Sequence, residues 1–139
     1  MFFIKIKVKG YLQNLTENTK ELINTNGIKN SNNISYIQNE IKHKIINYNK
    51  NIDNKQITLL RENNEFKHIM FFEENKKHNS EYYLKESNYS LNFTILTTKL
   101  IIEKNKIDIT YKILESDIIC HYVLEMSDNL WVLNKKSKL

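Results

Sequence analysis

The sequence predicts an all-β protein, folded as a single antiparallel up-and-down β-barrel of about eight or nine strands. Apolar and polar residues alternate along most of the chain, which is the pattern of half-buried strands. Helical spacing of apolar residues is not sustained, and the best candidate, from Leu12 to Ile23, is mostly polar. Short clusters of Asn, Ser and Asp separate the alternating runs, so neighbouring strands are expected to form a meander. Closure into a barrel lets every strand bury one face and removes exposed edges.

The strands of the first half of the chain are expected at 2–13, 20–28, 34–46 and 56–62. In the first of these, Ile4, Ile6 and Val8 alternate with lysines, and Ile57 and Leu59 repeat the pattern in the last. The chain has two glycines and no proline, although turns normally need one or the other. Asn tolerates the left-handed backbone conformation, so we expect it to replace glycine in the turns.

The strands of the second half are expected at 66–74, 80–86, 90–102, 106–115 and 118–127. Alternation is longest in the last of them, where every second residue from Ile118 to Met126 is apolar. We expect the stretch Trp131–Leu133 to be an appended strand end or plug, followed by a Lys-rich tail from about residue 134. Since there is no repeat, linker or composition break, residues 1–139 are expected to form one domain.

The charge of the chain is a weak guide to its partners. Asn, Ile and Lys make up 61 of the 139 residues, a bias typical of AT-rich coding sequence, so individual lysines need no functional explanation. A net charge of +5 would permit nucleic-acid binding, but the lysines are scattered among acidic residues and there is one arginine. Arginine is the preferred side chain for phosphate and base contacts, so nucleic acid is an unlikely partner.

Hydropathy and cysteine content suggest a cytoplasmic protein. No apolar run approaches the roughly 20 residues that a membrane-spanning helix needs, so no membrane association is expected. The first residues alternate Lys with apolar side chains and lack the continuous core of a signal peptide. The single cysteine, Cys120, cannot form an internal disulfide, which favours a reducing compartment.

The order of the strands resembles that of the YwiB-like bacterial family. The resemblance rests on the order of six segments: Ile57–Asn63, Phe66–Glu73, the Tyr-bearing Glu81–Leu84, the long strand Leu91–Leu100, Ile107–Ile113 and His121–Met126. It departs from the family pattern where Asn63 stands in place of a turn glycine. The resemblance implies a calycin-like (lipocalin-like) barrel in a small cytoplasmic protein of unknown function, with binding inside or at the mouth of the barrel. It supplies no catalytic residues.

Arg61 is the most informative single residue. Its position in the alternation places it on the same face as Ile57 and Leu59, which we expect to point inward. A buried guanidinium needs an acidic or hydrogen-bonding partner, because its desolvation is costly. It could therefore anchor an anionic group in the barrel. Alternatively, it could lie at a strand end and reach water, or pair with Glu73 or Glu125.

Tyr83, Tyr111 and Tyr122 are the other candidate ligand-binding residues, because aromatic side chains with a few hydroxyls commonly line small-molecule sites. Core packing would explain the same tyrosines. No metal or cofactor is expected, since the four histidines lack metal-ligand spacing. Cys120 and His121 point to opposite faces of one strand, which argues against a Cys–His nucleophile.

The expected function is non-enzymatic binding of a small, partly apolar or anionic molecule in or at the mouth of the barrel. The alternative is a protein- or RNA-interaction module that uses the Lys-rich outer surface. The sequence leaves open the identity of any ligand, the oligomeric state, and whether the barrel is hollow or filled.

Overall fold

The computed structural model describes residues 4–46 and 56–128, which contain strands and turns but no helix. These residues form ten strands: β1 (Ile4–Asn14), β2 (Thr19–Lys29), β3 (Ile34–Gln38), β4 (Ile41–Ile46), β5 (Gln56–Glu62), β6 (Phe66–Glu73), β7 (Lys77–Leu84), β8 (Tyr89–Glu103), β9 (Lys106–Ile113) and β10 (Ile118–Asp128). The stretch Trp131–Leu133 and the Lys-rich tail lie outside the described residues.

The strands form a closed antiparallel barrel in which each strand pairs with its neighbours in sequence, and β1 pairs with β10. This confirms the predicted up-and-down barrel. Gly10 permits the closure: a Cβ atom at this position would lie 1.8 Å from the carbonyl oxygen of Val123 on β10. The two backbones could not approach so closely with any other residue there.

One predicted strand is two strands in the structure. The expected strand at 34–46 is interrupted by a two-residue hairpin at Asn39 and Glu40, whose φ angles are 51° and 65°. Positive φ at both central residues is the type I′ arrangement, which normally carries Asn-Gly. This turn could not be recognised in the sequence, because Glu40 occupies the glycine position. This hairpin accounts for the tenth strand.

Asparagine does replace glycine in the turns, as the sequence predicted. Among residues 4–46 and 56–128, six non-glycine residues have positive φ, four of them asparagines, whereas neither glycine does. Asn75, Asn88 and Asp117 lie in the β6–β7, β7–β8 and β9–β10 connections, at or next to the predicted turn clusters. A short polar side chain lowers the cost of the left-handed conformation, so compact hairpins form without glycine.

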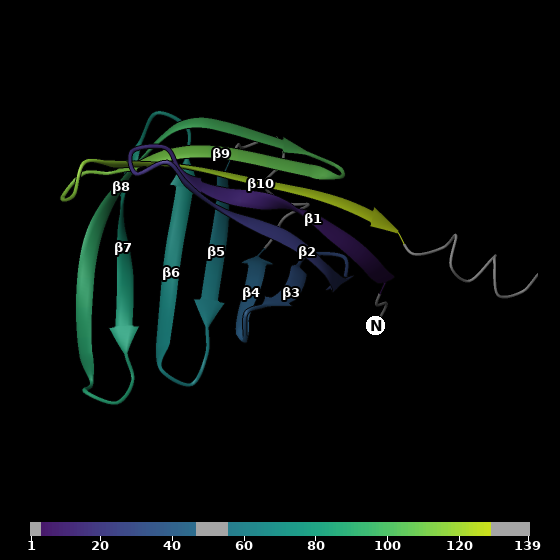
Figure 1. The fold of residues 1–139 in the computed structure, drawn as a ribbon, viewed down its shortest axis with the longest axis horizontal. Coiled ribbons are helices and arrows are strands. Elements are labelled where there is room, and N and C mark those ends of the chain that lie inside the picture. The colour runs from purple at the N-terminus through teal and green to yellow at the C-terminus, as the bar shows by residue number, and fades with distance from the viewer. Residues whose placement is uncertain (1–3, 47–55, 129–139) are drawn as a thin grey trace, which may run out of the picture.

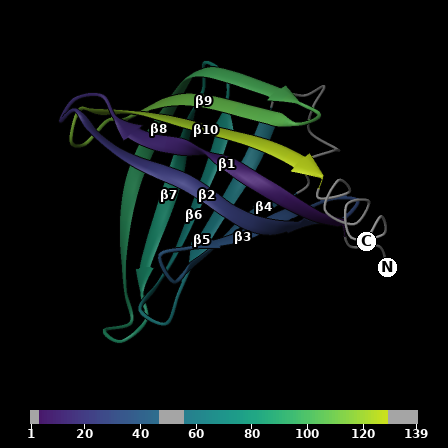
Figure 2. The ribbon, with the colours of Figure 1, turned by 45° about the vertical axis from the view of Figure 1, so that its right-hand side comes forward.

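The barrel is flattened into two layers, as Figures 1 and 2 show. β1, β2, β9 and β10 lie across one side and β3 to β7 across the other, while the long β8 bends from one layer into the other. The register of β8 on β9 shifts between Thr97 and Lys99, where the strand bulges. Apolar side chains from both layers meet between them, and Val8, Phe72, Ile107 and Leu124 are fully buried there.

Candidate functional site

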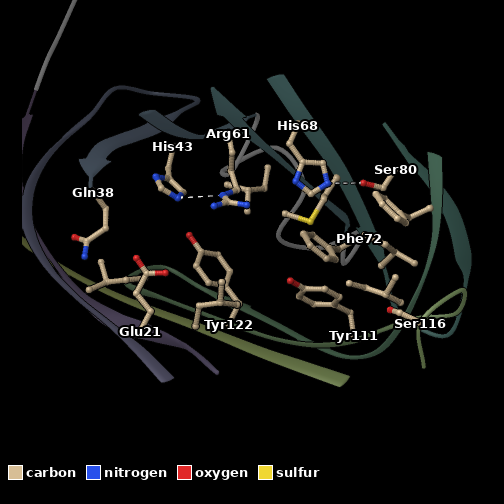
Figure 3. Close-up of a pocket in the computed structure, with 17 residues that line it drawn as sticks. Glu21, Gln38, His43, Arg61, His68, Phe72, Ser80, Tyr111, Ser116 and Tyr122 are labelled. Carbon is tan, nitrogen blue, oxygen red and sulfur yellow. Dashed lines mark hydrogen bonds between the residues drawn. The ribbon is translucent and has the colours of Figure 1, made fainter. Parts of the chain in front are cut away.

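The interior of the barrel is only partly filled. A cavity of about 220 Å³ remains between the two layers, lined by residues of all ten strands. The solvent-exposed side chains of Glu21 and Ser116 mark its two ends, and Gln38 lies beside Glu21 (Figure 3). Met70, Phe72, Ile95 and other apolar side chains line much of the wall. The cavity is therefore a hollow with an apolar wall that reaches the surface.

Polar side chains cross one wall of this cavity in a single row. His43 on β4 is directly opposite Arg61 on β5, and Arg61 is directly opposite His68 on β6. Residues in direct cross-strand register lie about 5 Å apart at Cβ and share a face. All three side chains point into the cavity, as Figure 3 shows. The predicted inward orientation of Arg61 is therefore confirmed.

His43 is a neutral imidazole that fixes the guanidinium of Arg61. Its Nδ1–H donates to the carbonyl oxygen of Ile41 at 3.1 Å, and its Nε2 accepts from Arg61 Nε at 3.3 Å. Burial, with Arg61 adding to it, lowers the pKa of His43 to about 4, which keeps Nε2 free to accept. Tyr36 stacks on the imidazole with ring centroids 4.6 Å apart.

His68 lies on the other side of Arg61. Its Nε2 is 2.9 Å from Ser80 Oγ, and that hydroxyl is 2.9 Å from the carbonyl oxygen of Ile69. Burial, again with Arg61 adding to it, lowers the pKa of His68 to about 4. Both imidazoles beside the guanidinium are thus uncharged near pH 7, and Arg61 carries the positive charge of the row.

Tyrosines from the facing layer complete the site. Tyr122 on β10 and Tyr111 on β9 are buried and line the cavity opposite the polar row. The hydroxyl of Tyr122 is hydrogen-bonded to that of Tyr36, so the pair joins the two layers. Burial raises the pKa of both Tyr111 and Tyr122, so each remains a neutral hydroxyl. Phe72 packs against Tyr111 with ring centroids 5.0 Å apart.

Arg61 has no carboxylate partner among the described residues. Neither acid suggested by the sequence is paired with it: Glu73 instead accepts hydrogen bonds from Gln56, Lys76 and His78, and no ion pair joins Arg61 to Glu125 or to any other described acid. Glu21, at the mouth, accepts from Asn39 Nδ2 at 2.6 Å. Within the part of the chain that the structure describes, Arg61 is therefore a cation in the cavity without an ion-pair partner.

The structure brings together three of the four predicted site residues. Arg61, Tyr111 and Tyr122 line one cavity, whereas Tyr83 does not. Tyr83 is opposite Lys67, on the outward face of β7, and its hydroxyl donates to Asn88 at 2.5 Å. With two tyrosines in succession on β7, periodicity alone did not decide which one points inward.

Sequence reasoning missed His43, His68 and Ser80, which complete the polar row. Their spacing in the sequence carries no motif, because they come from three different strands. The alternation of inward and outward side chains along β6 could have identified one of them. His68 alternates with Phe66, Met70 and Phe72, all of which face inward.

Cys120 and His121 point to opposite faces of β10, as predicted. Cys120 is buried inside the barrel, whereas His121 bonds to Asp108 and Tyr11 on the outside. Across residues 4–46 and 56–128, no group of three or more His, Cys, Asp or Glu side chains is placed to hold a metal ion. The same residues include no helix long and apolar enough to span a membrane.

Comparison with solved structures supports the predicted family likeness at the level of the fold. The structure is similar to the crystal structure of the ywiB protein from Bacillus subtilis, with a TM-score of 0.63 and 15% sequence identity. The match covers 91% of this chain and 92% of the other. The chain thus has a YwiB-like fold. No protein-family model and no curated protein sequence matches it.

Proposed function

We propose that this protein is a non-enzymatic, calycin-like binding barrel that takes up a small, partly apolar anion in the cavity between its layers. The observation that carries the proposal is the guanidinium of Arg61, which faces the cavity without a carboxylate partner among the described residues. A cation in such surroundings is costly unless an anion joins it. A bound oxyanion would supply that partner, and the planar guanidinium suits it.

The rest of the cavity fits a small amphipathic molecule. Its volume of about 220 Å³ is below the roughly 300–1,000 Å³ typical of sites for drug-sized ligands. Beyond Arg61, the wall continues with Met70, Phe72 and Ile95. A short carboxylate would place its charged end at Arg61 and its hydrocarbon part against these side chains.

The arrangement supports binding rather than catalysis. Both nitrogens of His43 are held by hydrogen bonds, one to the backbone and one to Arg61. Tyr122 is bonded to Tyr36, and burial raises the pKa of its hydroxyl, so it is a poor base or nucleophile near pH 7. These groups can orient a ligand but have no activated proton to transfer.

The experiment is a titration of ¹⁵N-labelled protein, followed by two-dimensional NMR, with three molecules of the same chain length: hexanoate, hexan-1-ol and hexylamine. We expect hexanoate to shift the signals of cavity residues and to bind at least tenfold more tightly than the alcohol, with no saturable binding of the amine. Arg61→Met should remove the preference for the anion. Equal affinity for hexanoate and hexan-1-ol, or no binding of either, would contradict the proposal.

Lys67→Met is the matched control for Arg61→Met. Lys67 is an exposed residue on β6, and its removal takes the same charge from the outer face. Hexanoate affinity should be unchanged in this variant, because the charge lies outside the cavity and is screened by water. An equal loss in both variants would attribute the binding to net charge rather than to the cavity.

The use of the Lys-rich outer surface for protein or RNA stays a prediction. Lys5, Lys7 and Lys9 lie on the outward face of β1, in line with the alternation in the sequence. Nothing in their arrangement selects a partner, because solvated lysines at this spacing are also what the composition of the chain would give.

A further inference from the structure

His68 carries a proton on Nε2, and its neighbours determine this. Ser80 Oγ is 2.9 Å from the carbonyl oxygen of Ile69, which can only accept, so the single hydroxyl hydrogen of Ser80 is donated there. The hydroxyl must then accept from His68 Nε2, also at 2.9 Å. Ser80 is completely buried, so no solvent competes for these bonds.

Nδ1 of His68 is consequently a buried acceptor without a partner. It is shielded from solvent and makes no hydrogen bond within the described part of the chain. The lowered pKa of His68 means that this nitrogen keeps its lone pair near pH 7. Buried polar atoms in folded proteins are nearly always satisfied, because an unmet one keeps the full cost of its desolvation. His43 differs in this respect, since both of its nitrogens have partners.

Nδ1 of His68 and the guanidinium of Arg61, which has no described carboxylate partner, belong to neighbouring residues. His68 is directly opposite Arg61 across the β5–β6 pair, and both side chains line the cavity. In Figure 3 the ring of His68 projects into the cavity between Arg61 and Ser80. A ligand that meets Arg61 with an oxyanion therefore brings its next atoms close to His68.

We propose that the ligand is a hydroxy acid: a carboxylate that binds Arg61 and carries, on the adjacent carbon, a hydroxyl that donates to His68 Nδ1. This inference rests on the proposed function, because it specifies the molecule that occupies the same cavity. A simple carboxylate would neutralise Arg61 but leave Nδ1 unmet. The hydroxyl satisfies the acceptor, and the hydrocarbon part remains against the apolar wall.

The test compares three ligands with the same chain and charge, measured by the same NMR titration: hexanoate, 2-hydroxyhexanoate and 2-methoxyhexanoate. The methoxy compound keeps the oxygen as an acceptor but has no hydrogen to donate. We expect wild-type protein to bind the hydroxy acid about tenfold more tightly than hexanoate and to show no gain with the methoxy compound. This comparison needs no variant, so it does not depend on the folding of a mutant.

Two substitutions then assign the effect to Nδ1. His68→Gln can keep an N–H for Ser80 but has no acceptor at the position of Nδ1, so it should bind hexanoate and the hydroxy acid equally. His68→Asn can place its carbonyl oxygen near the position of Nδ1 and should retain most of the preference. If His68→Gln kept the full preference, the hydroxyl would be recognised elsewhere and the inference would be overturned.

The outcomes separate this inference from the proposed function. If wild-type protein binds all three carboxylates equally and Arg61→Met abolishes that binding, the proposed function stands and the hydroxy-acid assignment is overturned, with Nδ1 served by water. If none of the three carboxylates binds, the proposed function fails and the assignment fails with it. A tenfold preference that disappears in 2-methoxyhexanoate and in His68→Gln supports both.

Discussion

Replacing Arg61 by Met should leave the unliganded protein about as stable as before while strongly weakening its affinity for anions. Met has a comparable length and no charge, so it fills much of the same space against the cavity wall. Most substitutions of an inward-facing residue destabilise a protein. Arg61 should be an exception, because its charge has no described carboxylate partner to lose.

The expected change in the free energy of unfolding is the balance of two opposing contributions. Substitution removes the bond from Arg61 Nε to His43, which is worth about 1 kcal/mol. It also removes the cost of holding a guanidinium partly out of water, and because Arg61 is only partly buried we discount that cost to about 1 kcal/mol. The free energy of unfolding should therefore change by less than about 1 kcal/mol. Anion binding should weaken by about 30- to 150-fold, as expected for a charge-assisted bond worth roughly 2–3 kcal/mol.

The assay is urea unfolding followed by far-ultraviolet circular dichroism, on wild type, Arg61→Met and the outer-face control Lys67→Met. We expect similar midpoints and similar slopes for all three. The reasoning would be refuted if Arg61→Met lost more than about 2 kcal/mol of stability while Lys67→Met did not. Arg61 would then be a structural residue, and its position in the cavity would no longer indicate a ligand.

The remaining predictions concern pH, the tyrosine pair and the hairpin. The pKa values of His43 and His68, about 4 in the folded protein, lie below their ordinary value of about 6.5. The unfolded chain therefore takes up protons first, and stability should fall between about pH 6.5 and pH 4, by up to roughly 3 kcal/mol per histidine. Urea midpoints across this range test it, and a flat profile would contradict it. Tyr122→Phe should cost about 1–3 kcal/mol by leaving the buried hydroxyl of Tyr36 unpaired, and the double substitution Tyr36→Phe/Tyr122→Phe should recover part of that loss; additive losses would argue against the bond. Glu40→Gly should stabilise the β3–β4 hairpin by about 1 kcal/mol, because Glu40 has a φ of 65°; a lower thermal midpoint would refute the strain.

The fold could be predicted because alternation is a strong signal wherever one face of a strand is buried. The inner residues of β1, β9 and β10 follow the period of two, and a one-residue slip would place them in water. The missed hairpin at Asn39 and Glu40 has a different cause. A type I′ turn is recognised by its residues, and Glu40 occupies the position where a glycine would have revealed it.

The site was less predictable because it is built across strands. Arg61 could be predicted from its position in the inward–outward alternation of its strand and from being the one arginine of the chain, both of which are visible in the sequence. Its neighbours His43 and His68 are separated from it by 18 and 7 positions, and only the register of β4, β5 and β6 brings them together. Tyr83 was predicted from its residue type, which suits a binding site. In the structure it lies on the outward face of β7, and its neighbour Tyr82 lies on the inward face.

The distribution of ion pairs argues for the interior as the functional surface. On the outside, basic residues that have partners use nearby acids, as Lys85 does with Glu62 at 2.7 Å and Lys112 with Asp117 at 2.6 Å. The exposed lysines that lack such a pair are solvated, so an unpaired charge there costs almost nothing and needs no explanation. Arg61 is in a different position, because a cavity with an apolar wall hydrates a cation poorly. The same alternation that places lysines outward on β1 places this arginine inward on β5, where, under the proposed function, a bound anion would offset the cost of its charge.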